Sequence, residues 1–535
     1  MKTHRWIPVP IIPRGRRVST TEVGTRAAIR GTGRPPVAAP TRWLGADMGI
    51  APVAVLLGIV GTLFTVIGSW IPAFWGDEAA SIMSAERPLA TIWRELGRVD
   101  AVHGAYYVFL HFWIDAFGAS ELSVRLPSSI AVGVAVAGTV VLADRLFTPV
   151  AAARRIAVIA GAVMIMLPRV GYMGAEGRSY AIGTAMAVWL TIFFVTLLQH
   201  RITGLLPWLA FAMLFALSIY VFLYLVLLAV VYGTAVVAAR PGRAIIHRWL
   251  GAIAVGVMLA APVIVYALSE HGQISFLAHR NYVTFTRMFV IQWFGNPWFA
   301  IACWAPILVA VVTLLRSRSR TVVLLVGWLA LPMGILIFGN IFIAPMYSIR
   351  YLSFTTPAVS ILVAVGVSTV FSRGAAAGWI RVAAVVALFG LALPSIVFER
   401  TQFAKDGGSD LRQAAQVIGA HARRGDAVVF DETTRPSRKP RLALRLYPQY
   451  FTGLSDVTLQ NPYTERSGIW DSVRPIREIA PSLRGISTVW DIELTTPESV
   501  STPVNVGALE HLGYTISRQI PVHRTIVYEL TRETT

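Results

Sequence analysis

Two adjacent carboxylates, Asp77 and Glu78, follow directly on the first long apolar run of the chain, in the sequence Phe-Trp-Gly-Asp-Glu-Ala. Like charges at this spacing, next to an apolar run, are expected to raise the pKa of at least one of the two groups. A carboxylate tuned in this way can act as general base on an acceptor hydroxyl. The simpler interpretation is a solvated acidic loop, so the surrounding sequence has to decide between them.

Two further pairs of polar residues lie close to apolar runs. Asp100 and His103 open an aromatic-rich stretch, where they can bind a metal ion, position a phosphate or hold an acceptor; alternatively, Asp100 simply caps a helix. Glu176 and Arg178 lie between two apolar runs. The planar fork of Arg178 suits phosphate oxygens, although a structural Glu–Arg ion pair explains the same residues.

Arg350 precedes a later apolar run and is a second candidate ligand for a phosphate; the alternative is an arginine that reaches out to the membrane surface. The polar segment 268–298 contains His271 and His279, and its length suits a lid over a donor head group. Together with Asp100 and Glu176, these histidines are candidate ligands for substrate or for a divalent metal ion. No metal-ligand spacing stands out among them, and a plain solvated loop remains the alternative.

The composition explains why these polar residues are notable. The chain has 535 residues, of which 55% are hydrophobic and 14% charged, whereas a typical soluble domain has about 25% charged residues. The net charge of +19 comes mostly from arginines beside apolar runs, which is an orientation signal for a membrane protein rather than a nucleic-acid footprint. A single cysteine, Cys303, excludes an intramolecular disulfide and a cysteine metal site.

The apolar runs divide the chain into three parts. Residues 1–49 are predicted to be a disordered, basic cytoplasmic arm, 50–399 a transmembrane domain and 400–535 a small soluble α/β domain. A spanning helix needs about 20 apolar residues. Eleven spans are predicted, at residues 50–72, 124–143, 156–172, 180–199, 204–219, 220–239, 249–267, 299–315, 321–339, 353–371 and 379–398.

Short basic loops set the predicted orientation, because such loops stay in the cytoplasm. They lie around residues 145–155, 240–248, 316–320 and 373–381, all on one side if eleven spans are correct. The aromatic stretch 105–118 is too short to cross and is predicted to lie on the outer leaflet as an interfacial helix. All the candidate site residues then face outward.

The tail after residue 398 is polar and mixed, and an odd number of spans places it outside the cell. Residues 409–424 are predicted to form an amphipathic helix, 427–431 and 486–492 short strands, and 514–530 a hairpin.

Taken in order, these segments resemble the GT-C membrane glycosyltransferases, above all the protein O-mannosyltransferases and the aminoarabinose–lipid A transferases. The resemblance covers residues 50–400. Its motifs are Trp-Gly-Asp-Glu at 75–78, Asp-Ala-Val-His-Gly-Ala-Tyr-Tyr at 100–107, Phe-Gly-Ala-Ser-Glu-Leu-Ser-Val-Arg-Leu-Pro-Ser at 117–128, Glu-Gly-Arg-Ser-Tyr at 176–180 and Ile-Arg-Tyr-Leu at 349–352. The resemblance implies a helical polytopic fold with juxtamembrane helices in the first outer loop.

The resemblance also implies an activity: transfer of a sugar from a polyprenyl-phosphate donor to a glycan, lipid or protein acceptor outside the cell membrane. Asp77 matches the presumed catalytic base, Glu78 is its neighbour, and the anomeric centre would be inverted. Arg178 and Arg350, with His103, would hold the donor phosphate. The family often has a proline pair where this chain has His-Gly-Ala at 103–105, so donor geometry and metal requirement stay open.

A transporter or flippase for a lipid-linked sugar is the main alternative, since it too would have many spans and outward polar residues. Transporters place ionisable residues near the middle of the membrane and often contain two related halves. Here the centres of the predicted spans are nearly free of charge, and no repeat is visible. The sequence therefore favours an enzyme over a transporter or an inactive glycan-binding scaffold.

Overall fold

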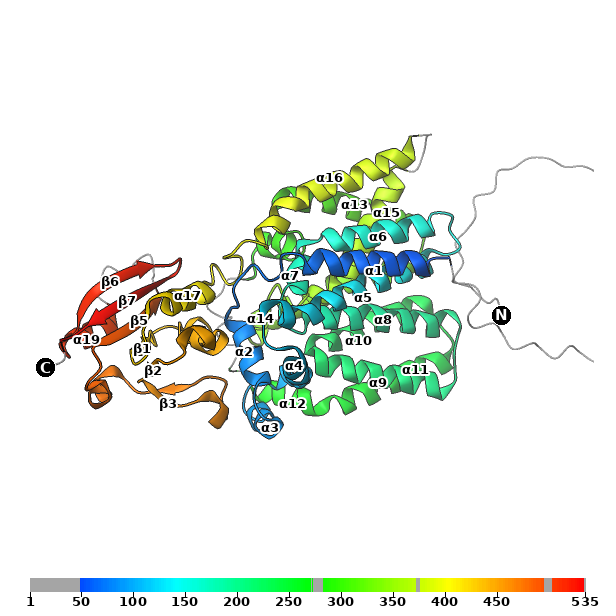
Figure 1. Cartoon of the computed structure of the whole chain (residues 1–535). Coiled ribbons are helices and arrows are strands. Elements are labelled where there is room, and N and C mark those ends of the chain that lie inside the picture. The colour runs from blue at the N-terminus through cyan, green and yellow to red at the C-terminus, as the bar shows by residue number, and fades with distance from the viewer. Residues whose placement is uncertain (1–48, 271, 273–281, 372–375, 495–502, 534–535) are drawn as a thin grey trace, which may run out of the picture.

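A helical bundle and a small α/β domain make up the computed structural model, which describes residues 49–270, 272, 282–371, 376–494 and 503–533. The long helices of the bundle run side by side, and the sheet domain lies beyond one of its ends (Figure 1). The short helix α2, Gly76–Ala85, lies where the two parts meet. The predicted fold class, a polytopic helical protein with a C-terminal α/β domain, is confirmed.

Apolar helices cover every one of the eleven predicted spans. Within the described residues, six helices are long and apolar enough to cross a membrane, or up to eight if two bent pairs count as single spans. The six are α5 (Glu121–Phe147), α8 (Tyr180–Gln199), α13 (Pro297–Arg316), α14 (Thr321–Phe342), η5 with α15 (Ser353–Val370) and α16 (Ala377–Phe398). The chain is a multi-pass membrane protein, and the number of eleven crossings stays a prediction.

The remaining predicted spans are shorter or bent. Three are the apolar helices α1 (Ala51–Val66), α9 (Leu205–Val221) and η2 with α10 (Leu223–Ala239). The bent pairs are α6 with α7 (Ala153–Met166 and Pro168–Gly174, 63°) and α11 with α12 (Arg243–Leu259 and Ala261–Ser269, 55°). Each bend coincides with a proline in the first turn of the second helix, where the missing N–H interrupts the helical hydrogen bonds.

The basic loops gather at the end of the bundle away from the α/β domain. Arg154 approaches Gly49 at the start of the first helix, Arg320 donates a hydrogen bond to the Ala239 carbonyl (2.9 Å), and Arg248 donates to that of Thr203 (3.0 Å). The candidate site residues that the structure describes lie at the other end, beside the α/β domain. This separation agrees with the predicted arrangement of loops, and which end faces the cytoplasm stays a prediction.

Short helices cover the site end of the bundle. After α2 come α3 (Leu89–Leu96), the single turn η1 (Ala101–His103) and α4 (Gly104–Phe117). Helix α4 coincides with the predicted interfacial helix. It buries Tyr106, Tyr107 and Leu110 and exposes the aromatic rings of Phe112 and Phe117, which suit contact with lipid at a membrane surface.

The C-terminal domain contains a five-stranded sheet in the order β2-β1-β5-β7-β6. Strand β1 (Ala427–Phe430) is parallel to β2 (Ser455–Asp456) and to β5 (Thr488–Leu494), while β7 (Thr525–Thr531) is antiparallel to β5 and to β6 (Thr515–Pro521). The predicted helix, strands and hairpin correspond to α17 (Leu411–His421), β1, β5 and β6–β7. The sequence did not predict β2, the small sheet β3–β4 (Leu459–Asn461 and Ser472–Val473), α18 (Leu442–Leu446) or α19 (Val504–Glu510).

Buried contacts join this domain to the segment that leads into α2. The Phe74 amide donates to the Tyr447 hydroxyl (2.9 Å), and the Ser409 hydroxyl donates to the Phe74 carbonyl (2.7 Å). A Cβ atom on Gly76 would lie 2.0 Å from the carbonyl oxygen of Ser437, so only glycine fits there. The α/β domain is thus packed against the loop that carries Asp77.

Candidate functional site

Asp77 is the centre of a cluster of charged residues at the site end of the bundle. Its Oδ2 lies 2.5 Å from Arg350 Nη1 and 3.8 Å from Arg178 Nη2. The Arg350 guanidinium lies over the rings of Trp75 and Tyr180, 5.0 and 5.9 Å from their centroids. The Asp77 side chain remains 24% exposed and that of Arg350 17% exposed. The acid that was predicted as the base is therefore partly exposed and contacts the two arginines that were predicted as phosphate ligands.

Three chain segments bring these residues together. Asp77 lies in the first turn of α2, where the positive end of the helix dipole favours an anion. Arg178 lies in the turn between α7 and α8, and Arg350 in the turn before η5. All three segments are connections at the same end of the bundle, which is why residues far apart in sequence meet there.

The two adjacent carboxylates do not act on each other as predicted. Burial alone would raise the pKa of Asp77, but Arg350 and Arg178 outweigh it and hold that pKa below its usual value. Burial is likewise outweighed for Glu78, whose pKa is lowered by Arg125. The expectation of a raised pKa in this pair is wrong, because each carboxylate has its own arginine.

Glu78 lies in an ion pair inside the protein. Its two oxygens accept hydrogen bonds from Arg125 Nε (2.7 Å) and Nη2 (2.6 Å), and neither side chain is exposed. The Gly177 amide also donates to Glu78 (2.9 Å), and Arg125 donates to the carbonyl of Ser69 (2.6 Å). Arg125 was not among the residues selected from the sequence. A signal for it was present, because an arginine this close to a predicted span is costly unless it is paired.

Asp100 and His103 border the same cluster. The Tyr107 hydroxyl donates to Asp100 Oδ2 (2.7 Å), and Arg178 Nη1 donates to that hydroxyl (3.4 Å). Asp100 makes no side-chain capping bond, so this contact replaces the capping role considered from sequence. Burial and the nearby Arg178 lower the pKa of His103 to about 4, and within the described residues its Nδ1 has no hydrogen-bond partner. The lowered pKa favours a neutral imidazole, and its Nδ1 is a buried nitrogen that no described residue engages.

Glu176 lies behind the cluster. It is fully buried, its Oε1 is 3.6 Å from Arg350 Nη1, and neither oxygen accepts a hydrogen bond from any residue that the structure describes. Burial raises its pKa, an effect that Lys405 and Arg350 partly oppose. Arg350 is thus shared between two carboxylates, one exposed and one buried.

The candidate metal ligands do not assemble in the described part of the chain. No group of three or more histidine, cysteine, aspartate or glutamate side chains there could hold a metal ion. His271 and His279 lie outside the described residues. Asp100 and Glu176 are each engaged with the arginine–tyrosine cluster instead.

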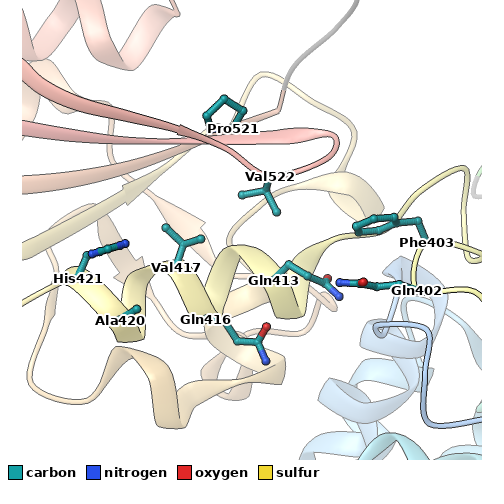
Figure 2. A pocket seen from close by; sticks show the side chains of 9 residues that line it. All are labelled: Gln402, Phe403, Gln413, Gln416, Val417, Ala420, His421, Pro521 and Val522. Carbon is teal, nitrogen blue, oxygen red and sulfur yellow. The ribbon is translucent and has the colours of Figure 1, made fainter.

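A separate groove of about 410 Å³ lies in the C-terminal domain, between α17 and the β6–β7 hairpin (Figure 2). Its lining includes the amides of Gln402, Gln413 and Gln416, together with Phe403 and His421. None of the predicted site residues lines it, and it offers no arginine, lysine or acid. The groove suits a neutral group, so the Asp77 cluster is the better candidate for chemistry on a phosphate.

Comparison with known proteins identifies the fold. No protein-family model and no curated protein matches the chain. The structure is similar to ArnT from Cupriavidus metallidurans bound to undecaprenyl phosphate, with a TM-score of 0.54 and 14% identity over 90% of this chain and 98% of that chain. The structure of ArnT from the same organism in the apo state is similar to the same degree, with a TM-score of 0.54 and 14% identity over 89% of this chain and 98% of that chain. The similarity shows that this chain shares the fold of ArnT, as expected from the sequence.

A more distant similarity is to an oligosaccharyltransferase from Archaeoglobus fulgidus tethered with an acceptor peptide. Its TM-score is 0.45 at 11% identity, over 82% of this chain and 69% of that chain.

Proposed function

We propose that this protein is a membrane glycosyltransferase that moves a sugar from a polyprenyl-phosphate donor to a cell-envelope glycan, lipid or protein. The observation that carries the proposal is the contact of one accessible carboxylate, Asp77, with two arginines at the end of a membrane-embedded bundle. The likeness in fold to ArnT, solved with undecaprenyl phosphate, supports a lipid-phosphate donor. A hexose such as mannose is our candidate for the sugar.

The arginines would bind the donor phosphate. A guanidinium fork matches two phosphate oxygens, and both Arg350 and Arg178 now face the Asp77 carboxylate. A donor that takes these contacts would withdraw positive charge from Asp77. The carboxylate would then become a stronger base at the moment when the substrate is bound. The unpartnered nitrogen of His103 would supply one more hydrogen bond to the phosphate.

In the chemical step, the acceptor oxygen attacks the anomeric carbon and its proton passes to Asp77. The bond between the anomeric carbon and the phosphate oxygen breaks, and the electron pair leaves with the phosphate. Arg350 and Arg178 stabilise the charge that develops on this leaving group. A single displacement of this kind inverts the anomeric centre. Glu78, held by Arg125, would keep the first turn of α2 in place during the step.

The proposed location is a bacterial inner membrane, with the N-terminal arm in the cytoplasm and the α/β domain outside. The native cysteine, Cys303, is buried and will not compete in a labelling test. A cysteine at the exposed position Glu510 should react with a membrane-impermeant maleimide on spheroplasts. A cysteine at Ser317, in the basic loop at the other end, should react only after lysis. The reverse pattern would invert the proposed orientation.

The activity can be tested with purified protein in detergent and a radiolabelled polyprenyl-phosphate hexose. Product should form without membrane compartments, which a flippase cannot achieve. Asp77→Asn and Asp77→Ala should lower transfer by a factor of about 10² to 10⁴, the usual contribution of a general base. The exposed acid Asp115 provides the matched control, and Asp115→Asn should retain wild-type transfer. Full transfer by both Asp77 variants would remove Asp77 from the chemistry.

A further inference from the structure

The groove between α17 and the β6–β7 hairpin contains a buried amide that lacks a partner. Gln413 lies on α17, and its side chain lines the groove although only 8% of the residue is exposed. Its Oε1 accepts no hydrogen bond from any residue that the structure describes. Buried side-chain oxygens are nearly always hydrogen-bonded in folded proteins. A ligand that carries hydroxyl groups can supply the missing donor from the groove.

The other amides of the groove are also uncharged hydrogen-bonding groups. Gln416 follows Gln413 by three residues on α17, and Figure 2 shows the amides of Gln402 and Gln413 facing one another. A glutamine amide provides two donors and one acceptor oxygen. Among the described residues that line the groove, none is an arginine, a lysine or an acid. This set of groups matches hydroxyls, which both donate and accept, better than it matches a phosphate or a carboxylate.

A cation beside the groove is already engaged within the protein. Arg518 on β6 forms an ion pair with Glu529 through its Nε (3.4 Å), and its Nη1 lies 3.2 Å from Nδ1 of His421, which lines the groove. An anionic ligand would therefore have to compete with Glu529 for this arginine. The surroundings of the groove, like its lining, favour a neutral ligand.

Apolar side chains form the rest of the walls. The Phe403 ring lies flat on the ring of His523, with centroids 4.0 Å apart and planes within 8°, and Val417 and Val522 lie nearby in the lining. Ligand sites of about 300–1,000 Å³ typically combine apolar and aromatic walls with a few polar groups, and this groove measures about 410 Å³. A sugar ring suits such walls, because its faces carry C–H groups and its edges carry hydroxyls.

The backbone on the hairpin side of the groove disfavours a peptide. Pro521 has no N–H, and the amide of Val522 donates to the carbonyl of Thr525 (2.9 Å). An extended peptide binds beside a strand through main-chain hydrogen bonds. These two positions have no N–H left to donate to it, so the side-chain amides supply the hydrogen bonds, as for a glycan.

The groove is held next to the loop that carries Asp77. Arg412, the residue before the buried amide, donates to the Trp70 carbonyl (3.1 Å). The Ser409 hydroxyl donates to the Phe74 carbonyl (2.7 Å). Both contacts join the start of α17 to the segment that leads into α2. A ligand in the groove is thus carried by the same element that packs against this loop.

We propose that this groove binds a neutral glycan and holds the part of the acceptor that is remote from the reacting hydroxyl. The acceptor role rests on the proposed function of the Asp77 cluster. Sugar hydroxyls hydrogen-bond to Gln413 and Gln416, and a sugar ring packs against the apolar wall that includes Phe403. Binding energy from a remote part of a substrate favours longer acceptors. Among the proposed acceptors, the groove thereby selects a glycan.

Binding of oligosaccharides to the full chain tests the groove without any transfer reaction. The probes are neutral tetrasaccharides of mannose, glucose or galactose, titrated by ligand-observed NMR in a detergent that has no sugar head group. The wild type should bind at least one of them, and it should bind tetragalacturonate and a neutral tetrapeptide more weakly. The proposal fails if no neutral tetrasaccharide binds, or if the charged glycan or the peptide binds more tightly.

Two substitutions assign the binding to the groove. Gln413→Met removes the buried amide and should weaken binding by a factor of about two to ten, the effect of one neutral hydrogen bond. Ala420→Phe, at an exposed position of the lining, should fill the groove and weaken binding further. The matched control is Gln460→Met, at an exposed position of β3, which should bind as the wild type does. Wild-type affinity in both groove variants would place the glycan elsewhere and overturn the proposal.

Thermal melting distinguishes a ligand-binding amide from a structural one. Gln413→Met should keep or raise the Tm, because it replaces a buried polar group that has no partner with an apolar side chain. A marked loss of Tm would show that the protein itself satisfies this amide, and its assignment as a glycan ligand would be wrong.

Transfer kinetics separate the groove from the proposed function. With the tetrasaccharide that binds, the KM for acceptor should rise in Gln413→Met and Ala420→Phe by the factor by which binding weakens, and the KM for donor should not follow it. If the wild type binds the glycan but transfers no sugar, the proposed function fails and the glycan site stands. If it transfers sugar and neither variant changes the acceptor KM, the acceptor role is overturned.

Discussion

Two faces of α2 each carry a carboxylate paired with an arginine, but the two pairs differ in burial and in the number of hydrogen bonds. On the inner face, Glu78 and Arg125 are completely buried, bound through two hydrogen bonds, and further saturated by backbone groups. On the site face, Asp77 and Arg350 share a single hydrogen bond and remain partly exposed, and Arg350 also reaches Glu176. A carboxylate has about four acceptor sites and a guanidinium five donors. The comparison teaches that unused hydrogen-bonding capacity, rather than the presence of an ion pair, distinguishes the face that we propose to be reactive.

The largest expected effect is a loss of stability when the ion pair on the inner face is broken. Arg125→Met leaves Glu78 charged and buried without its partner, which typically costs about 3–5 kcal/mol. We expect a large drop in Tm and in the yield of folded protein. The double variant Arg125→Met with Glu78→Gln should recover part of this loss, because no uncompensated charge remains. If Arg125→Met melts at the wild-type temperature, the inner pair is not structural and the comparison fails.

The site face should respond in activity instead. Arg350→Lys keeps the charge but loses the planar fork, so kcat/KM for the donor should fall by a factor of about 10² to 10³, the usual effect of removing a transition-state donor. The Tm should change little, since the Arg350 side chain is partly exposed. Steady-state transfer and melting of the same preparation check both. A large loss of Tm with an unchanged kcat/KM would reverse the assignment of the two faces.

The pH dependence of transfer should differ between the free and the donor-bound protein, because the donor changes the charges around Asp77. The arginines lower the folded pKa of Asp77, so its contribution to stability is present above its ordinary pKa of about 4 and is lost as pH falls through the lower folded value. Donor binding should withdraw Arg350 and raise that pKa. The acid limb of kcat should therefore lie at higher pH than that of kcat/KM. Coincident limbs would contradict release of Asp77 by the donor.

The smallest predicted effect is a loss of stability when the hydrogen bond between the C-terminal domain and the segment before α2 is removed. Ser409→Ala removes the buried hydrogen bond to the Phe74 carbonyl and should cost about 1 kcal/mol of unfolding free energy. A small decrease in Tm with a nearly unchanged KM for donor is expected. Ser517→Ala, at an exposed position of the hairpin, is the control. An effect on kcat beyond tenfold would mean that this contact takes part in positioning Asp77 more directly than its geometry suggests.

Much of the arrangement could be predicted from the sequence because it depends on hydropathy. The apolar runs gave helices at all eleven predicted spans, and the alternation of their ends placed Asp77, Arg178 and Arg350 at one end of the bundle. The segment 105–118 was kept out of the count because of its length, and it forms a separate short helix, α4. These inferences need only the length of a helix and the preference of charges for the membrane surface.

Other features depend on contacts that no local pattern contains. Successive residues of a helix point about 100° apart, and hydropathy does not tell which of Asp77 and Glu78 faces Arg125. Because the arginine partners were not known from the sequence, one of the two pKa values was wrongly expected to be raised. Lys405 was assigned to a separate soluble tail, because nothing in its neighbourhood indicates that it meets Tyr172 on α7.

The tight fit of Gly76 against Ser437 bears on how the protein is made in the cell. The loop carrying the acids leaves the ribosome long before the segment that closes it: Ser409 and Phe74, which share a hydrogen bond, are 335 residues apart in sequence. A nascent chain must therefore insert its helices first and assemble its reactive centre last. The proposed activity would begin only after the tail has been synthesised and has folded against this loop.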